Sequence, residues 1–190
     1  MPTYADLEPQ CVAWAAARGL LHPDGTANQA TPESQHRKTM EEVGEAQESL
    51  ELKMRTGTAY SCRALALELG DILVTLVLQS ALQGVVWDEC LASASRHQAG
   101  WGSTWRASQP SDPPCTWQFV EFHGSMLGMA IEQGHPGDAR TYIGAVARCV
   151  EDVARVELAL LGPECLELAL AKIEGRRGET VNGVFVKEEE

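Results

Sequence analysis

The chain has 190 residues, of which 44% are apolar and 22% are charged, and its formal net charge is −12. This length allows one domain with a sizeable core or two small halves packed tightly together. The acidic balance argues against a protein that grips nucleic acid through its phosphates, because such binding needs basic surface. It suits a protein that gathers carboxylates around hard divalent cations.

The cysteines and the apolar segments both favour a cytoplasmic protein. Six cysteines are scattered without a C-x-x-C pair, mostly in apolar periodic segments: Cys11, Cys62, Cys90, Cys115, Cys149 and Cys165. We expect them to be buried reduced thiols. Asp6 and Glu8 come early in the chain and no basic segment precedes an apolar one, which is unlike a signal peptide. The longest apolar stretch, residues 72–86, is interrupted by polar residues and is too short to span a bilayer.

The first half of the chain reads as a series of helices. The spacing of apolar residues predicts helices over residues 7–18, about 31–55, 61–83 and 87–98. The second begins with Thr31 as N-cap and Pro32 at the first helical position, and its apolar residues recur at intervals of three and four. Gly19 and Gly84 are predicted to end the helices that precede them.

Residues 100–115 are rich in Gly, Ser and Pro and are predicted to be a linker. The pattern after them predicts helices over residues 116–133, 138–161 and 163 to about 175, and a strand-like run over 184–186. We therefore predict an all-α helical bundle. Its parts would be a half over residues 1–99, the linker, and a second half over residues 116–190 packed with the first as one unit.

A weak internal repeat relates the two halves. Residues 88–92 (DECLA) resemble residues 163–167 (PECLE), and residues 39–44 can be laid over residues 119–124. An ancestral duplication is one interpretation, and the chance likeness of two amphipathic helix pairs is the other.

The residues that suggest chemistry are two pairs of acids on neighbouring predicted helices. Glu42 and Glu45 are three residues apart, as are Glu68 and Asp71, so each pair lies on one helix face. The second pair sits in the most apolar helix, where ionised carboxylates are costly unless a cation neutralises them. Mg²⁺ suits such a set because it prefers carboxylate, water and phosphate oxygens. A solvated acidic helix face is the alternative interpretation.

The pattern E-E-x-x-E at residues 41–45 followed by E-x-x-D at residues 68–71 resembles the MazG-like all-α nucleoside triphosphate pyrophosphohydrolase superfamily, which includes the dimeric dUTPases. Residues 14–20 resemble the first helix of many such proteins. Residues 172–189 are similar to the C-terminus of small phage-type members. The resemblance covers about residues 14–98 and 163–189, and it does not identify the substrate.

This resemblance implies Mg²⁺-dependent hydrolysis of a (d)NTP to (d)NMP and pyrophosphate for nucleotide-pool control or house-cleaning, with Mn²⁺ as a substitute ion. It implies that the metal ligands are Glu42, Glu45, Glu68 and Asp71. Glu41 is our candidate general base or partner of the attacking water, and a surface carboxylate is the alternative. The chain departs from small family members in its extra residues after Gln98. The repeat aligns Phe122, Ser125, Val146 and Cys149 with the four acids, so the second half is expected to lack a metal site.

Candidate substrate contacts lie at both ends of the chain. Lys172 and Arg176 share a helix face and are expected to bind phosphate, although a basic last turn also suits a helix dipole. The further candidates are Lys38, Arg177 and Lys187 for phosphate, Asn182 for a base or sugar, and Trp14 for stacking on a base. The alternative role of Asn182 is to form a turn, and the alternative role of Trp14 is to pack in the core.

Two other functions remain open at this point. One is a non-catalytic helical module that binds a metal or a nucleotide, which the degenerate second half favours. The other is phosphoribosyl-ATP pyrophosphohydrolase, which no residue selects. The expected partners are a nucleoside triphosphate and a second copy of the chain, since the bundles of this superfamily usually form from two or more chains; neither nucleic acid nor membrane is expected.

Overall fold

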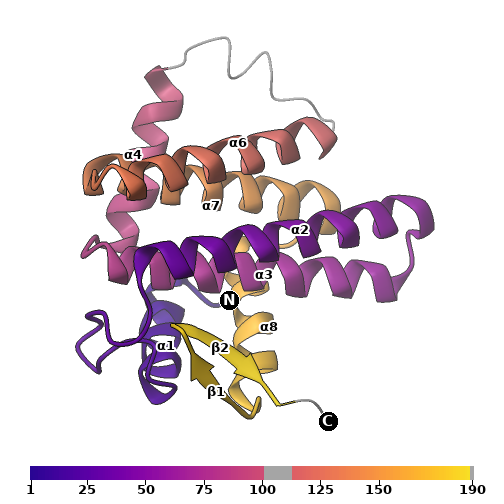
Figure 1. Ribbon diagram of the computed structural model, residues 1–190. Helices are drawn as coiled ribbons and strands as arrows, with labels where there is room; N and C mark the ends of the chain where they lie inside the picture. Colours follow the sequence, from indigo (N-terminus) through magenta and orange to yellow (C-terminus); the bar gives the residue numbers. More distant parts are fainter. Residues whose placement is uncertain (101–112, 189–190) are drawn as a thin grey trace.

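The computed structural model describes residues 1–100 and 113–188, and most of them are helical (Figure 1), which confirms the predicted all-α class. The helices in this part of the chain are α1 (Tyr4–Ala17), α2 (Pro32–Thr56), α3 (Ala59–Leu82), α4 (Trp87–Gly100), α6 (Pro113–Glu132), α7 (Pro136–Leu158) and α8 (Gly162–Glu174). The strands β1 (Gly178–Val181) and β2 (Val184–Lys187) form a small hairpin near the C-terminus.

Most helix boundaries lie close to the predicted ones, and two differ for clear reasons. Thr31 caps α2 as predicted, accepting a hydrogen bond from the Ser34 N–H. The predicted start of α1 at Leu7 was wrong, because Thr3 and Asp6 cap each other and allow the helix to begin at Tyr4. Residues 113–115 of the predicted linker belong to α6, and residues 101–112 lie outside the described residues.

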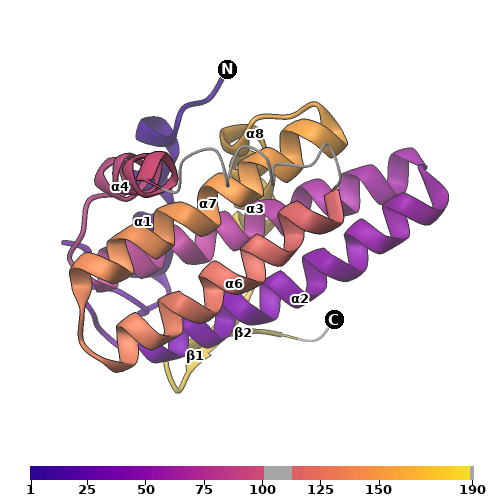
Figure 2. The same ribbon diagram turned by 90° about the horizontal axis from the view of Figure 1, so that it is seen from above.

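Two antiparallel helix pairs form the body of the fold. α2 packs on α3, α6 packs on α7, and the second pair lies over the first (Figures 1 and 2). α3 is the most buried element, with every residue from Leu69 to Ser80 shielded from solvent. It is the one described helix that is long and apolar enough to cross a membrane, and 78% of that stretch is buried inside the fold. The acids of α3 are therefore fixed in the centre of the molecule.

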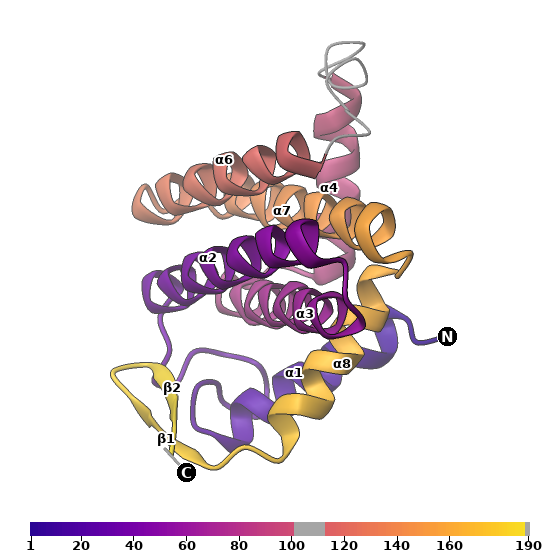
Figure 3. The same cartoon turned by 90° about the vertical axis from the view of Figure 1, so that its right-hand side faces the viewer.

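Each pair is crossed by a shorter helix from the other half of the chain. α8 lies across α3, and α4 lies across α7 (Figure 3). Both crossings depend on a glycine: a Cβ on Gly70 of α3 would lie 2.1 Å from the carbonyl oxygen of Cys165, and one on Gly144 of α7 would lie 2.0 Å from that of Cys90. Any side chain would push the helices apart, so the two glycines set how closely α8 and α4 approach.

The hairpin and α1 close the end of the molecule nearest the C-terminal part of α8 (Figure 3). The strands pair antiparallel, with Thr180 opposite Phe185. Asn182 and Gly183 form the two-residue turn, both with positive φ, as such tight hairpins require. The sequence predicted only the second strand, because the first contains Gly178 and Glu179 and has no apolar alternation.

Four of the five described cysteines are buried, as the sequence predicts, and Cys62 is the exception. Cys11, Cys90, Cys149 and Cys165 are buried, Cys62 is half-buried, and all five are free. Burial raises the pKa of the four buried thiols to about 12, so they are protonated and unreactive at neutral pH. Cys115 has no described side chain.

Candidate metal centre

Three of the four predicted metal ligands come together between α2 and α3. Glu42, Glu68 and Asp71 each offer a carboxylate oxygen, and these oxygens lie within 4.8 Å of one another. The i, i+3 spacing of Glu68 and Asp71 puts both on the face of α3 that meets α2 and α8. Glu45 is exposed and stands outside this group, although it lines the same cavity.

Burial makes this trio costly without a cation. Glu42 is only 6% exposed and Asp71 7%. Glu42 Oε2 and Glu68 Oε2 are buried and have no hydrogen-bond partner. Burial raises the pKa of Glu42 to about 7, helped by the charges of Asp71 and Glu45 and opposed by Lys38. Burial also raises the pKa of Glu68.

Two lysines from different helices contact the trio. Lys38, one turn before Glu42, lies 2.7 Å from Glu42 Oε1 and 2.8 Å from Glu41 Oε1. Lys172 of α8 lies 2.6 Å from Asp71 Oδ2 and 3.6 Å from Glu68 Oε1. Burial tends to lower the pKa of Lys38, but its bonds to the two glutamates leave that pKa raised. Both ammonium groups therefore neutralise part of the acidic charge.

The acids line a cavity of about 580 Å³, and Lys38, Glu41 and Lys172 lie with them at what we call its acidic end. Arg176 lines the same cavity, and its backbone contacts Arg18. Much of the remaining lining is apolar. The apolar wall is formed by Trp14, Leu20, Val74, Leu78, Ile173 and Phe185. Such a cavity can hold a ligand with one strongly anionic part and one flat apolar part.

Trp14 and Phe185 are held in place by Arg18. The guanidinium carbon of Arg18 lies 4.6 Å from the Trp14 ring centroid and 5.1 Å from that of Phe185. Its NH2 donates to the carbonyl oxygens of Ile173, Glu174 and Arg176 at the end of α8. The Trp14 indole N–H also donates to the Ile173 oxygen, at 3.2 Å. One arginine thus ties α1, α8 and the hairpin together around the apolar end.

The predicted substrate contacts divide into two groups. Lys38, Lys172, Arg176 and Trp14 line the cavity, as does the candidate base Glu41. Asn182 does not line it, because this residue forms the exposed tip of the hairpin turn. Arg177 is also outside the lining, and the side chain of Lys187 lies outside the described residues.

Sequence reasoning missed three residues that shape the cavity. Gln35 is 4% exposed, lines the cavity and donates its amide to the Thr75 carbonyl oxygen. Gln35 lies two helical turns before Glu42 and so on the same face of α2, and this spacing could have identified it as a cavity residue. The sequence pattern assigns Phe185 only to a strand and Arg18 only to the end of the first helix. Their roles depend on contacts between distant segments, which the local pattern does not contain.

The residues present fit a hard divalent cation. Three carboxylates converge, two of their oxygens are buried without a partner, and the described trio contains no thiol or imidazole. Oxygen-only donors of this kind suit Mg²⁺ or Mn²⁺ better than softer metals. Comparison of the chain with protein-family models, curated proteins and solved structures gave no significant match.

Proposed function

We propose that this protein hydrolyses a nucleoside triphosphate to a monophosphate and pyrophosphate with the help of Mg²⁺ held at the acid trio. The observation that carries the proposal is the pair of buried oxygens, Glu42 Oε2 and Glu68 Oε2, that lack a partner beside two lysines. A helical scaffold gains nothing from buried unpaired carboxylates, which cost several kcal/mol. A cation site accounts for them. The family resemblance of the acid pattern points to the same chemistry.

The two ends of the cavity suit the two parts of a nucleotide. Lys172 lies beside the acids and Arg176 lines the same cavity, so both are available to bind phosphate oxygens. Trp14 and Phe185, held at 5.6 Å between ring centroids, supply an apolar wall for a base. The bound metal would neutralise phosphate oxygens and lower the pKa of a coordinated water. Glu41 would take the proton from the attacking water, and its bond to Lys38 keeps its carboxylate at the mouth of the acidic end.

We further propose that the second half descends from the first by duplication and has lost its acids. The buried residues of α2 and α6 share one spacing, which matches Thr39, Glu42, Val43, Ala46 and Leu50 with Val120, His123, Gly124, Leu127 and Ile131. The glycine crossings match Gly70 with Gly144 and Cys165 with Cys90.

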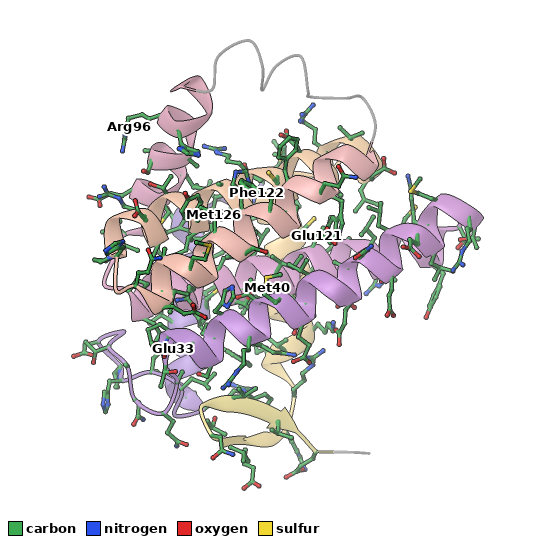
Figure 4. The ribbon with its side chains drawn as sticks, turned by 45° about the horizontal axis from the view of Figure 1, so that its top comes forward. Glu33, Met40, Arg96, Glu121, Phe122 and Met126 are labelled. Carbon is green, nitrogen blue, oxygen red and sulfur yellow. The ribbon has the colours of Figure 1, made fainter. Side chains whose placement is uncertain are left out.

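The packing supports a different alignment of the halves from the one expected from the sequence. Phe122, expected to match Glu42, is 44% exposed on α6 (Figure 4). Ser125 is also exposed. The burial pattern matches His123 with Glu42, and the crossings match Tyr142 with Glu68 and His97 with Lys172. These three rings lie together, with centroids 6.0 to 6.4 Å apart. An aromatic cluster thus occupies the place of the acids.

Pyrophosphate release from a panel of standard and modified (d)NTPs, with Mg²⁺ or Mn²⁺, tests the proposed activity. We expect turnover of at least one dNTP. Glu42→Gln and Asp71→Asn should each lower kcat/KM by about a thousandfold, since each weakens the charge stabilisation that the ion supplies. Glu121→Gln is the matched control, because Glu121 is exposed on α6 away from the cavity (Figure 4). A folded protein that turns over none of these nucleotides would contradict the proposal.

A further inference from the structure

In the acid trio, some carboxylate oxygens contact lysines and others have no partner. Glu42 Oε1 contacts Lys38 and Glu68 Oε1 contacts Lys172, whereas Oε2 of each glutamate is unpaired. Asp71 Oδ2 contacts Lys172. We call the space at the unpaired oxygens the open position. The lysines and a metal ion therefore need not compete, because they can use different oxygens of the same carboxylates.

The open position has room for one ion. Oxygens bound to one Mg²⁺ are about 3 Å apart when adjacent and about 4.2 Å apart when opposite, since each Mg–O bond is about 2.1 Å. The ligand atoms of Glu42, Glu68 and Asp71 lie within 4.8 Å of one another, so small side-chain adjustments would bring all three onto one ion. A second ion would have to stand about 3.5–4 Å from the first and share the same carboxylates. Lys172 Nζ already lies in contact with two of them, Glu68 and Asp71.

Lys172 is fixed there by the fold. It belongs to α8, whose backbone meets α3 at Gly70, one residue before Asp71. The crossing is too close for any side chain at position 70, so the backbone of α8 packs tightly against α3 there. The side chain of Lys172 is 26% exposed. The helix packing therefore holds the backbone of Lys172 beside the acids.

We propose that the site binds one divalent ion in the absence of nucleotide, with Lys38 and Lys172 as positioning residues and the Lys172 ammonium in the place of a second ion. This inference rests on the proposed metal site and deepens it, by giving the number of ions and a role for both lysines. It makes Lys172 both a partner of the ligands and a cation facing the substrate phosphates.

Titration of the full chain with Mn²⁺ alone, followed by isothermal calorimetry and by electron paramagnetic resonance, tests this inference. The wild type should bind one ion. Lys172→Met should bind two, the first about tenfold more tightly, because an ammonium no longer repels it. Lys172→Arg keeps the charge and should bind one. Lys53→Met is the control: it removes the same charge from a lysine that is paired with Glu157 and lies outside the cavity lining, and this variant should bind one ion.

Two results would overturn the inference: two ions on the wild type, or one ion on folded Lys172→Met. Circular dichroism in the presence of a chelator checks that each variant folds, and Lys172→Gln replaces Lys172→Met if the latter does not. The wild-type count decides in either case. The outcomes also separate the two proposals. If Lys172→Met gains an ion but no nucleotide is hydrolysed, the single-ion site stands and the proposed activity fails. If nucleotide is hydrolysed and the count stays unchanged in Lys172→Met, the activity stands and the role of Lys172 fails.

Discussion

At the α3–α8 crossing, the side chains beside Gly70 are acids and a lysine, whereas at the α7–α4 crossing, beside Gly144, they are histidine and tyrosine rings. The backbone contact is the same in both places, a glycine against a cysteine carbonyl oxygen. The first arrangement leaves two buried oxygens unpaired, and the second fills its space with packed rings. One helix geometry can therefore hold either a site that needs a cation or a core that needs none.

The largest effect on this comparison is expected from an alanine at each glycine. A Cβ at Gly70 or Gly144 would lie about 2 Å from a backbone carbonyl oxygen, so the crossing helix must move. Gly70→Ala and Gly144→Ala should each lower the free energy of unfolding by about 3 kcal/mol, as overpacking does. Urea denaturation measures this.

Only Gly70→Ala should also change Mn²⁺ affinity, because it displaces α8 and with it Lys172. Gly44→Ala, where nothing lies within 4 Å of the added Cβ, is the control for both. Equal Mn²⁺ affinity in Gly70→Ala and Gly144→Ala would show that the α8 crossing does not affect the acid trio.

The aromatic cluster should make stability fall in acid. Burial, with the nearby His97, lowers the pKa of His123 to about 4 from its usual 6.5. The unfolded chain then takes up a proton below pH 6.5 while the folded chain stays neutral there, so stability is lost as the pH falls from 6.5 towards 4. Lowering the pH from 7 to 5 should therefore reduce the free energy of unfolding by about 2 kcal/mol through His123.

His123→Phe removes the titrating ring and keeps an aromatic side chain against Phe119 and Tyr142. Its unfolding free energy should depend less on pH between 7 and 5 than that of the wild type, by about the same 2 kcal/mol. An unchanged pH dependence in this variant would show that the folded aromatic cluster accommodates a protonated histidine.

The smallest effect is expected at the arginine that supports the apolar end of the cavity. Arg18→Met removes bonds to three carbonyl oxygens at the end of α8, and should cost about 1 kcal/mol of stability and raise the nucleotide KM more than it lowers kcat. Arg155→Met removes an exposed pair with Asp152 in the second half and should change stability by less than about 0.5 kcal/mol. Equal losses in the two variants would argue against a special role for Arg18.

The sequence predicted what depends on local periodicity. The helix pairs, the Thr31 cap and the shared faces of Glu42 with Glu45 and of Glu68 with Asp71 all follow from spacings of three and four. Spacing alone could not tell that Glu45 is exposed while Glu42 is buried, since this depends on where α3 packs against α2.

The proposed relation between the halves depends on packing, which the sequence does not contain. Sequence alignment of the two halves matches Phe122 with Glu42, since Gly44 and Gly124 then align. Burial favours His123, because the face of α6 that meets its neighbours is offset by one residue. The roles of Arg18 and Phe185 were equally hidden, since their contacts join segments more than 150 residues apart.

The exchange of α4 and α8 between the two halves has a consequence for how this chain can change. In an assembly of two identical chains, every substitution appears twice, so a site cannot be lost on one side alone. Here α8 completes the acidic site from the far end of the same polypeptide, and α4 does the same for the aromatic cluster. Each of the two places is encoded by its own codons, so one can accumulate substitutions that favour packing while the other keeps its charges.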